Sequence, residues 1–262
     1  MAAGGTGPVM ETNEMSSCVW ITGASSGIGA ALAVEMAARG YIIAATARSA
    51  DALADLAADV PNIHAFPGDV TDRAGMVALV GEIERDLGPI NLAVLNAGIY
   101  LPTSFPAFDA SIFDRSFEVN IGGTVNCLAP LVPAMSARRA GRIAIVSSVA
   151  GYGGLPTSAA YGATKAALFN LGESLAMDVA AYGIKVSMIA PGFVKTPATD
   201  VNEFPMPFII EADDAARRIA NGLEKGKAHI AFPKRFSFLL RLINLLPRGS
   251  YTRLVGMTTK SK

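Results

Sequence analysis

Short, unbroken apolar runs alternate with longer segments of helical periodicity along most of this chain. Runs such as 18–22 (CVWIT), 41–47 (YIIAATA) and 142–147 (RIAIVS) show no polar alternation. A parallel strand covered by helices on both faces is buried on both faces, so it is apolar throughout. The order of these runs therefore predicts an α/β protein, with a doubly wound, Rossmann-like parallel sheet in a single domain.

The expected elements follow this rhythm from residue 18 to residue 232. The strands are expected at 18–22, 41–47, 63–67, 92–96, 142–147, 185–190 and 229–232. The helices are expected at 29–39, 51–59, 72–87, 109–135, 160–182 and 212–225. Four prolines between 191 and 207 interrupt the rhythm, and long loops inside compact domains are usually functional, so a substrate lid is expected at about 193–210. Residues 1–17 lack an apolar run and are expected to be a flexible leader.

Composition excludes several other classes of protein. With 262 residues, 51% of them hydrophobic, the chain can bury a core without disulfides. Its two cysteines, Cys18 and Cys127, cannot form a disulfide framework, which favours a cytoplasmic location. The two histidines, His64 and His229, are isolated in the sequence, so no metal site is expected. No apolar run reaches the ~18 residues that a membrane span needs.

A glycine-rich turn, TGASSGIG at 22–29, joins the first expected strand to the first helix. Glycines allow a tight turn and a close backbone approach to a pyrophosphate, and the free N–H groups of the next helix favour that anion. The turn predicts a dinucleotide site, and a purely structural glycine turn is the alternative. The residues expected to bind the dinucleotide here are Gly23, Ser25, Ser26, Gly27, Ile28 and Gly29.

The end of the second strand bears on which dinucleotide binds. Ala47 stands where an acidic residue would bind a ribose 2′-hydroxyl, and Arg48 follows it. An arginine there accommodates a 2′-phosphate, so NADP(H) is preferred over NAD(H) as the expected cofactor, although an arginine at a strand end is also ordinary. Asp69, followed by Val70, is expected to cover the adenine edge and accept from its amine.

A tyrosine and a lysine stand four residues apart at the start of an expected helix. Tyr161 and Lys165 therefore share one helical face. A nearby ammonium and an oxidised nicotinamide favour the phenolate and lower a phenol pKa from its usual ~10, so Tyr161 is a candidate general acid or base. Ser148, thirteen residues before Tyr161, follows a strand, where ligands bind in such sheets.

These motifs occur in one order together with Asn96-Ala97-Gly98, Asn120 and Pro191-Gly192. From about Cys18 to Phe232 the chain resembles the short-chain dehydrogenase/reductase family, in its shorter single-domain branch. It departs from the family's Tyr-x-x-Ser-Lys in having Thr164 before the lysine.

The resemblance implies a role for each residue of the set. Tyr161 is implied to be the catalytic acid/base, and Lys165 to bind the nicotinamide ribose and lower the pKa of Tyr161. Ser148 is implied to hold the reacting oxygen, with Ser147 structural, and Asn120 to hold a water of a proton relay.

The resemblance also implies contacts outside the glycine turn. Asn96, Ala97 and Gly98 are implied to brace the strand beside the cofactor. Contacts on the nicotinamide side are implied for Pro191, Gly192, Val194 and Thr196. Members of the family pair through long helices, so a homodimer or homotetramer is expected through 109–135 and 160–182.

The residues expected to wall the substrate site are mostly aromatic or aliphatic: Tyr100, Tyr152, Leu155 and Phe193. Such walls suit an apolar alcohol, ketone or aldehyde, because a buried ionic substrate would need fixed partners. We therefore expect an NADP(H)-dependent oxidoreductase that moves a hydride between nicotinamide and an apolar substrate. The alternative is a non-catalytic dinucleotide-binding sensor or scaffold, which has no need of an intact Ser148, Tyr161 and Lys165.

The C-terminal segment is basic and apolar. Residues 225–262 contain nine basic and no acidic side chains, whereas the preceding residues contain 13 basic and 22 acidic ones. Leucines crowd residues 236–246, and Pro247 ends the run. Two interpretations of 233–262 stay open: contact with an anionic membrane surface through 234–257, or a helix that closes the substrate pocket or packs on a sister subunit. Nucleic-acid binding is not expected, because no stacking platform or recognisable module is present.

Overall fold

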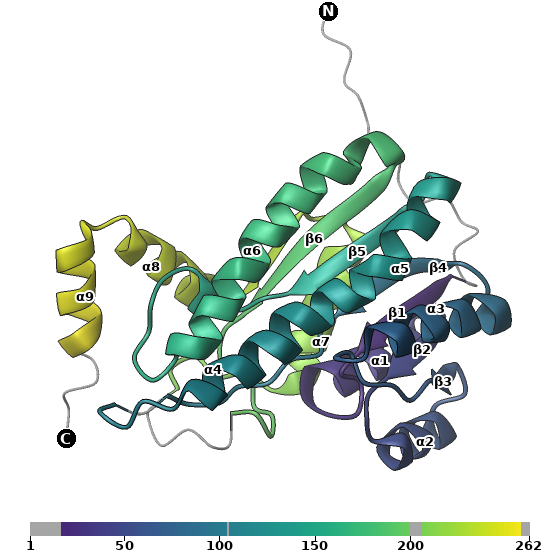
Figure 1. Cartoon of the computed structure of the whole chain (residues 1–262), viewed down its shortest axis with the longest axis horizontal. Coiled ribbons are helices and arrows are strands. Elements are labelled where there is room, and N and C mark those ends of the chain that lie inside the picture. Colours follow the sequence, from purple (N-terminus) through teal and green to yellow (C-terminus); the bar gives the residue numbers. More distant parts are fainter. Residues whose placement is uncertain (1–16, 104, 200–205, 258–262) are drawn as a thin grey trace, which may run out of the picture.

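The computed structural model describes residues 17–103, 105–199 and 206–257, which form a layered α/β fold (Figure 1). Within them, seven parallel strands make one sheet in the order β3-β2-β1-β4-β5-β6-β7. The strands are β1 (Cys18–Thr22), β2 (Ile42–Thr46), β3 (Ile63–Ala65), β4 (Ile90–Leu95), β5 (Gly141–Val146), β6 (Ile184–Pro191) and β7 (His229–Phe232). The direction of winding reverses between β1 and β4, so the doubly wound sheet is confirmed.

Helices cover both faces of this sheet (Figure 1). They are α1 (Gly27–Ala38), α2 (Ala50–Asp59), α3 (Arg73–Leu87), α4 (Ala110–Phe117), α5 (Gly123–Arg138), α6 (Ala159–Val179), α7 (Ala212–Glu224), α8 (Lys234–Asn244) and α9 (Arg248–Met257). The helix expected over 109–135 is divided, because a π-helical turn at Glu118–Gly122 separates α4 from α5.

Alternate residues of the central strands enter two separate hydrophobic cores. On β1, Val19 and Ile21 pack with residues of α1 and α7, whereas Trp20 packs on the opposite face with residues of α3 and α5. All three side chains are fully buried, and the Trp20 indole donates to Thr46 Oγ1 at 2.9 Å. Burial on both faces is the physical reason that the strands are apolar throughout.

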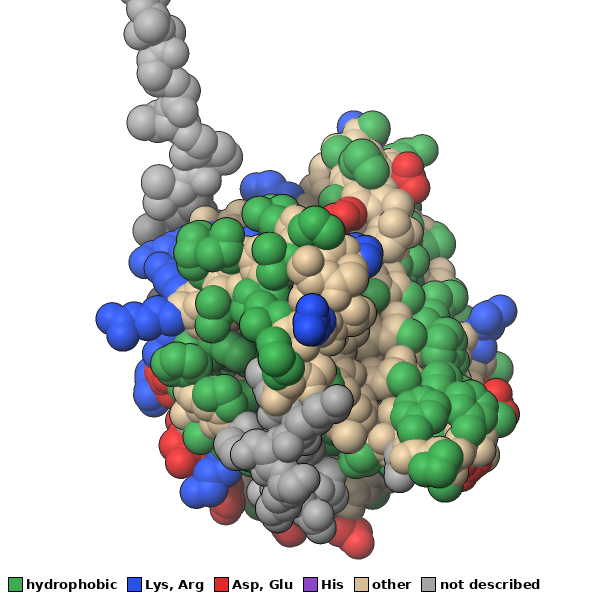
Figure 2. All heavy atoms as spheres, turned by 90° about the vertical axis from the view of Figure 1, so that its left-hand side faces the viewer, with side chains coloured by type: hydrophobic (Ala, Val, Ile, Leu, Met, Phe, Trp, Pro, Cys, Tyr) green, Lys and Arg blue, Asp and Glu red, His purple; other side chains and the backbone are tan. Residues whose placement is uncertain are grey.

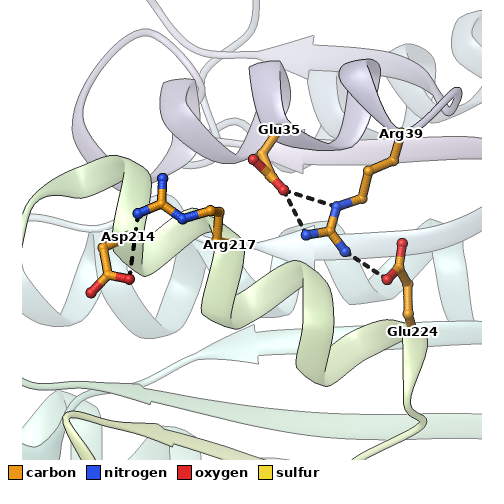
Figure 3. A network of polar contacts seen from close by, with 5 residues as sticks. All are labelled: Glu35, Arg39, Asp214, Arg217 and Glu224. Carbon is orange, nitrogen blue, oxygen red and sulfur yellow. Dashed lines mark hydrogen bonds and ion pairs between the residues drawn. The ribbon is translucent and has the colours of Figure 1, made fainter.

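An ion-pair network joins α1 to α7 on one of these faces (Figure 3). Arg39 contacts Glu35 of its own helix and Glu224 of α7, at 2.6 Å each. Arg217 pairs with Asp214 along α7 at 3.5 Å. Such partly exposed pairs contribute at most about 1 kcal/mol each, so they fix the helix orientation more than they stabilise the fold.

The two C-terminal helices extend beyond the carboxyl end of β7, at the left of Figure 1. Among the described helices none is both long and apolar enough to cross a bilayer. The expected leader lies outside the described residues, apart from Ser17, and so do the middle of the expected lid, 200–205, and the last five residues of the chain.

Candidate active site

The glycine-rich turn has the geometry that a pyrophosphate requires. Gly23 and Gly27 adopt positive φ values of 67° and 54°, and a β-carbon on Gly29 would collide with the carbonyl oxygen of Gly23. Ser26 precedes α1, and within the described chain its side chain makes no capping hydrogen bond. The first N–H groups of α1 are therefore available to an anion at the helix N-terminus.

The start of the loop after β6 lies against this turn. A β-carbon on Gly27 would come within 3.0 Å of the Thr196 methyl carbon. An isolated parallel bridge between Val194 and Ile210 joins the two ends of the expected lid. Thr196 thus lies beside the turn, and the expected cofactor contacts of Thr196 and Val194 stay predictions.

The segment after β4 braces the glycine-rich turn. Asn96 Nδ2 donates to the carbonyl oxygens of Thr22 and Gly23, at 3.0 and 3.2 Å. The Thr22 hydroxyl oxygen accepts from the N–H groups of Asn96 and Ala97, at 3.0 Å each. Gly98 approaches the catalytic candidates, since a β-carbon there would be 3.4 Å from Lys165 Nζ.

One cavity of about 1600 Å³ runs from the glycine-rich turn to the C-terminal helices. Pockets for drug-sized ligands are typically ~300–1,000 Å³, so this cavity has room for a dinucleotide and a substrate together. Of the residues expected from the sequence, those that line it are Gly23, Ser25, Ser26, Gly27, Ile28, Arg48, Asp69, Val70, Asn96, Ala97, Gly98, Tyr100, Ser148, Leu155, Tyr161, Lys165, Pro191, Gly192, Phe193, Val194 and Thr196. Gly29, Asn120 and Tyr152 are not part of its lining.

Asp69 and Arg48 lie at the same end of the cavity as the glycine-rich turn. Asp69 Oδ1 accepts from the N–H and the hydroxyl of Thr71, at 2.9 Å each. Burial alone would raise the pKa of Asp69, but these hydrogen bonds and the nearby Arg48 hold that pKa below its usual value. Asp69 is therefore an ionised acceptor.

Tyr161, Ser148 and Lys165 come together at the carboxyl ends of the central strands. Ser148 follows β5, and Tyr161 and Lys165 lie one turn apart in α6. The side chains of Tyr161 and Ser148 lie close enough for Ser148 to lower the pKa of the phenol. Lys165 Nζ lies 5.5 Å from the centre of the Tyr161 ring and donates to the carbonyl oxygen of Val146 at 2.9 Å.

Burial dominates the pKa values of Tyr161 and Lys165. Burial raises the pKa of Tyr161 to about 12, and the nearby Ser148 offsets only part of that rise. Burial also lowers the pKa of Lys165 to about 8. Desolvation of the phenolate is thus the dominant effect on Tyr161, and Nζ of Lys165 is directed at Val146. The expected effect of the ammonium and a bound nicotinamide on the phenol stays a prediction.

The two adjacent serines have different surroundings. The Ser147 hydroxyl donates to the carbonyl oxygen of Lys165 at 2.7 Å, which ties β5 to α6. The Ser148 Oγ accepts from the N–H of Ala150 at 3.1 Å and faces Tyr161. Ser148, which the thirteen-residue spacing predicted, is thus the serine of this pair that lies near the phenol of Tyr161.

Asn120 lies in the π-helical turn and is fully buried. Its Oδ1 accepts from the N–H of Ile99 at 2.7 Å, and its Nδ2 donates to the Ile99 carbonyl and to Thr164 Oγ1 at 3.0 Å each. The Thr164 hydroxyl in turn donates to the Tyr161 carbonyl at 2.7 Å. The amide therefore braces α6 beside Tyr161, and the expected water-holding role stays a prediction.

Tyr100 packs edge-on against Tyr161, with ring centres 5.1 Å apart and an interplanar angle of 83°. Its hydroxyl oxygen is buried and has no hydrogen-bond partner among the described residues. A buried polar atom without a partner is costly, so this hydroxyl is a natural contact for a polar atom of a ligand.

Tyr152 departs from the expectation of a substrate wall. Its ring stacks on Phe169 at 5.2 Å, and its hydroxyl lies 3.3 Å from His229 Nε2. The Arg241 guanidinium, from α8, lies 4.8 Å from the centre of the Tyr152 ring and 2.7 Å from His229 Nε2. His229 is thus not isolated in space. No local pattern predicts this cluster, because its members are 77 and 89 residues apart along the chain.

The C-terminal helices complete the cavity. Residues of α8 and α9 that line it are Phe236, Leu239, Leu240, Ile243, Leu254 and Val255. The sequence had left a pocket-closing role open for this segment, and the structure supports that role. Among the described residues, no group of three or more histidine, cysteine or acidic side chains is placed to hold a metal ion.

A family model described as short chain dehydrogenase matches residues 17–204, well over half of the chain. This chain belongs to the short-chain dehydrogenase/reductase family. It is therefore an oxidoreductase of that family, as the order of its motifs predicted.

Other members of this family are similar over most of their length. An uncharacterised oxidoreductase of Myxococcus xanthus is 34% identical over 87% of this chain and 91% of its own. The acetoacetyl-CoA reductase of Synechocystis is 35% identical over 68% of this chain and 72% of its own.

Solved structures of short-chain dehydrogenases share the fold. One from Streptomyces avermitilis is 27% identical, with a TM-score of 0.79, covering 93% of this chain and 98% of its own. The structure of ElxO with NADP bound is 28% identical, with a TM-score of 0.74, and the match covers 82% of this chain and 97% of ElxO. The family's fold thus extends over nearly the whole described chain.

Proposed function

We propose that this short-chain dehydrogenase/reductase is an NADP(H)-dependent enzyme that interconverts an apolar alcohol and its ketone or aldehyde. The observation that carries the proposal is that Tyr161, Ser148 and Lys165 line the same cavity as the glycine-rich turn, with Lys165 Nζ 5.5 Å from the centre of the Tyr161 ring. One cavity then holds a dinucleotide, an acid/base and a hydroxyl donor within reach of a single substrate.

The chain's own residues supply the proton and the orientation. When bound, the dinucleotide would supply or accept the hydride. The Ser148 hydroxyl donates to the reacting oxygen and holds it next to Tyr161. With a pKa near 12, Tyr161 is protonated at neutral pH, so it is ready to donate its proton in the direction of reduction. Lys165 lies one helical turn away and is placed to hold the nicotinamide ribose.

The residues of the turn fit the dinucleotide. The uncapped start of α1 would hold the pyrophosphate, and Asp69 and Val70 would contact the adenine side. Arg48 after β2, with no acidic residue at position 47 or 48, supports a preference for the 2′-phosphate of NADP(H). The similarity to ElxO with NADP bound also supports that preference.

The substrate end of the cavity is apolar. Its walls include Leu155, Phe193, Met206, Leu240 and Ile243. A substrate with an aliphatic or aromatic body gains from burial there, whereas an ionic one would meet no charged side chain among these five residues. The Tyr100 hydroxyl offers one polar contact beside Tyr161.

The test is a screen of NADPH oxidation over apolar aldehydes, ketones, sterols and retinoids, with an acyl thioester included. Turnover of apolar carbonyl compounds supports the proposal. Tight NADPH binding with no turnover of any compound would favour the alternative of a non-catalytic sensor or scaffold. Turnover of the acyl thioester alone would assign another substrate class to the same site.

Several expectations about partners and location remain proposals. They are a homodimer or homotetramer, a cytoplasmic location and contact of 234–257 with an anionic membrane surface. Sedimentation velocity of the purified chain tests the first.

A further inference from the structure

We infer that the outer face of α8 and α9 docks on an anionic lipid bilayer and that apolar substrate enters the cavity directly from the lipid. The docking surface stands on its own geometry, and only the substrate route rests on the proposed function.

Helix α8 has two apolar faces, one more than a surface helix needs. Phe236, Leu240 and Ile243 line the cavity. Phe238, Leu242 and Leu245 share the opposite face, and their exposed fractions are 69%, 53% and 81%. We call these last three residues the α8 stripe. Large apolar side chains gathered in this way mark an interaction site rather than ordinary surface.

Basic side chains border the stripe. Lys234, Arg235, Arg248 and Arg253 are exposed on α8 and α9, and residues 225–262 contain no acidic side chain. The helices lie at the left of Figure 1, so they face the viewer in Figure 2, which shows hydrophobic side chains gathered near Lys and Arg.

The positive charge around the α8 stripe favours an anionic bilayer over a second copy of the chain as its partner. In a symmetric dimer through this face, the same basic residues of two copies would meet without any acidic partner, and like charges would oppose the contact. An anionic bilayer satisfies both features, because its hydrocarbon buries the stripe and its headgroups attract the arginines. With 11 residues, α8 is about 16 Å long and lies on such a surface rather than crossing it.

The cavity reaches this outer face. Leu239 of α8 and Leu254 of α9 both line the cavity, yet 46% and 39% of each remains exposed. A substrate dissolved in the bilayer would therefore pass these two leucines and arrive at the apolar end of the cavity without crossing water. Passage through lipid is an advantage only for a substrate that partitions into it, which agrees with the apolar walls.

Contacts of Arg241 on the inner side of α8 fix the position of the helix. Arg241, the basic residue in the middle of the helix, is directed toward His229 and Tyr152 rather than toward the outer face. Burial and Arg241 both lower the pKa of His229, so the ring stays neutral and accepts from the guanidinium. This cluster holds the stripe outward.

Co-sedimentation of the full chain with vesicles tests the docking. Vesicles of phosphatidylcholine with phosphatidylglycerol should bind the wild type, and the triple variant Phe238→Ser/Leu242→Ser/Leu245→Ser should bind at least about tenfold more weakly. Val34→Ser/Val77→Ser, which removes exposed apolar residues from α1 and α3, is the matched control and should bind like the wild type. Equal binding by the triple variant would overturn the inference, provided that its melting curve and NADPH affinity are unchanged.

A second pair of variants tests the charge. Arg235→Gln/Arg253→Gln should weaken binding to anionic vesicles about 10- to 30-fold. Lys225→Gln/Lys227→Gln, which changes two lysines just before the start of β7, should weaken binding less. Equal effects of the two pairs would overturn the role of the basic border. Absence of wild-type binding, with a dimer that the triple variant dissociates, would assign the face to a second copy instead.

The substrate route needs turnover as the readout. The triple variant should reduce a water-soluble aldehyde at the wild-type rate. Its rate on a long-chain ketone supplied within vesicles should be several-fold lower than that of the wild type. Equal rates on the vesicle-borne ketone would overturn the route. A chain that binds vesicles but reduces no carbonyl compound would contradict the proposed function and leave the docking supported.

Discussion

The ammonium of Lys165 donates to the carbonyl oxygen of Val146 at the end of β5, 2.9 Å away. This bond holds Nζ beside Gly98, where a β-carbon would lie 3.4 Å from it. The lysine is thus fixed by the main chain of the central strand, rather than by Tyr161.

Removing the phenol should separate chemistry from binding. Tyr161→Phe keeps the ring that packs on Tyr100 but loses the transferable proton. Turnover should fall at least about 100-fold, while the NADPH dissociation constant changes less than about threefold. Steady-state kinetics and fluorescence titration measure the two quantities. A variant as active as its parent would remove Tyr161 from the proposed mechanism.

Lys165 should make stability depend on pH. Its pKa is about 8 in the folded chain and near its ordinary 10.5 when unfolded, so the unfolded chain binds more protons between those values. The contribution of Lys165 to the free energy of unfolding should therefore rise from pH 8 to about 10, and below pH 8 the full penalty of burying the ammonium applies. Burial raises the pKa of Cys18 and Cys127 to about 12, so these two thiols lower stability above about pH 9 and oppose the rise in the wild type. Urea denaturation at several pH values should therefore show the Lys165 slope as the difference between the wild type and Lys165→Met. Lys185→Met, at an exposed position of β6, is the control and should retain the slope.

Arg48 should discriminate between the two dinucleotides. Arg48→Ala should raise the NADPH dissociation constant about 10- to 100-fold, because a charge-assisted contact with the 2′-phosphate is lost. The NADH dissociation constant should change little. Arg85→Ala, on an exposed part of α3, serves as the control. Equal losses for both dinucleotides would contradict the preference for NADP(H).

The glycine-rich turn should tolerate no side chain at position 29. In Gly29→Ala the new methyl would collide with the Gly23 carbonyl oxygen, so the turn must shift and NADPH affinity should fall at least about tenfold. Gly81→Ala is the contrasting change, because a β-carbon at this exposed position of α3 meets no atom of the described chain within 4 Å. It should raise stability by about 0.5–1 kcal/mol without changing affinity. Thermal melts and NADPH titrations distinguish the two variants.

Local pattern was enough to predict the sheet and most of the site. Strands buried on both faces leave unbroken apolar runs, and a four-residue spacing places Tyr161 and Lys165 on one face of α6. Three features depend on tertiary context instead. The π-helical turn around Asn120 inserts an extra residue that periodicity does not show, and Tyr152 turns toward partners 77 and 89 residues away. The raised pKa of Tyr161 follows from burial, which no spacing reveals.

Trp20 is the single tryptophan of the chain, and it lies fully buried in β1 with its indole bonded to Thr46. Its fluorescence is therefore an intrinsic optical probe of the central sheet. Emission should shift to longer wavelength only when the strands separate, and it should be silent to rearrangements of the C-terminal helices. Its emission would thus report separation of the central strands without interference from movement of the C-terminal helices.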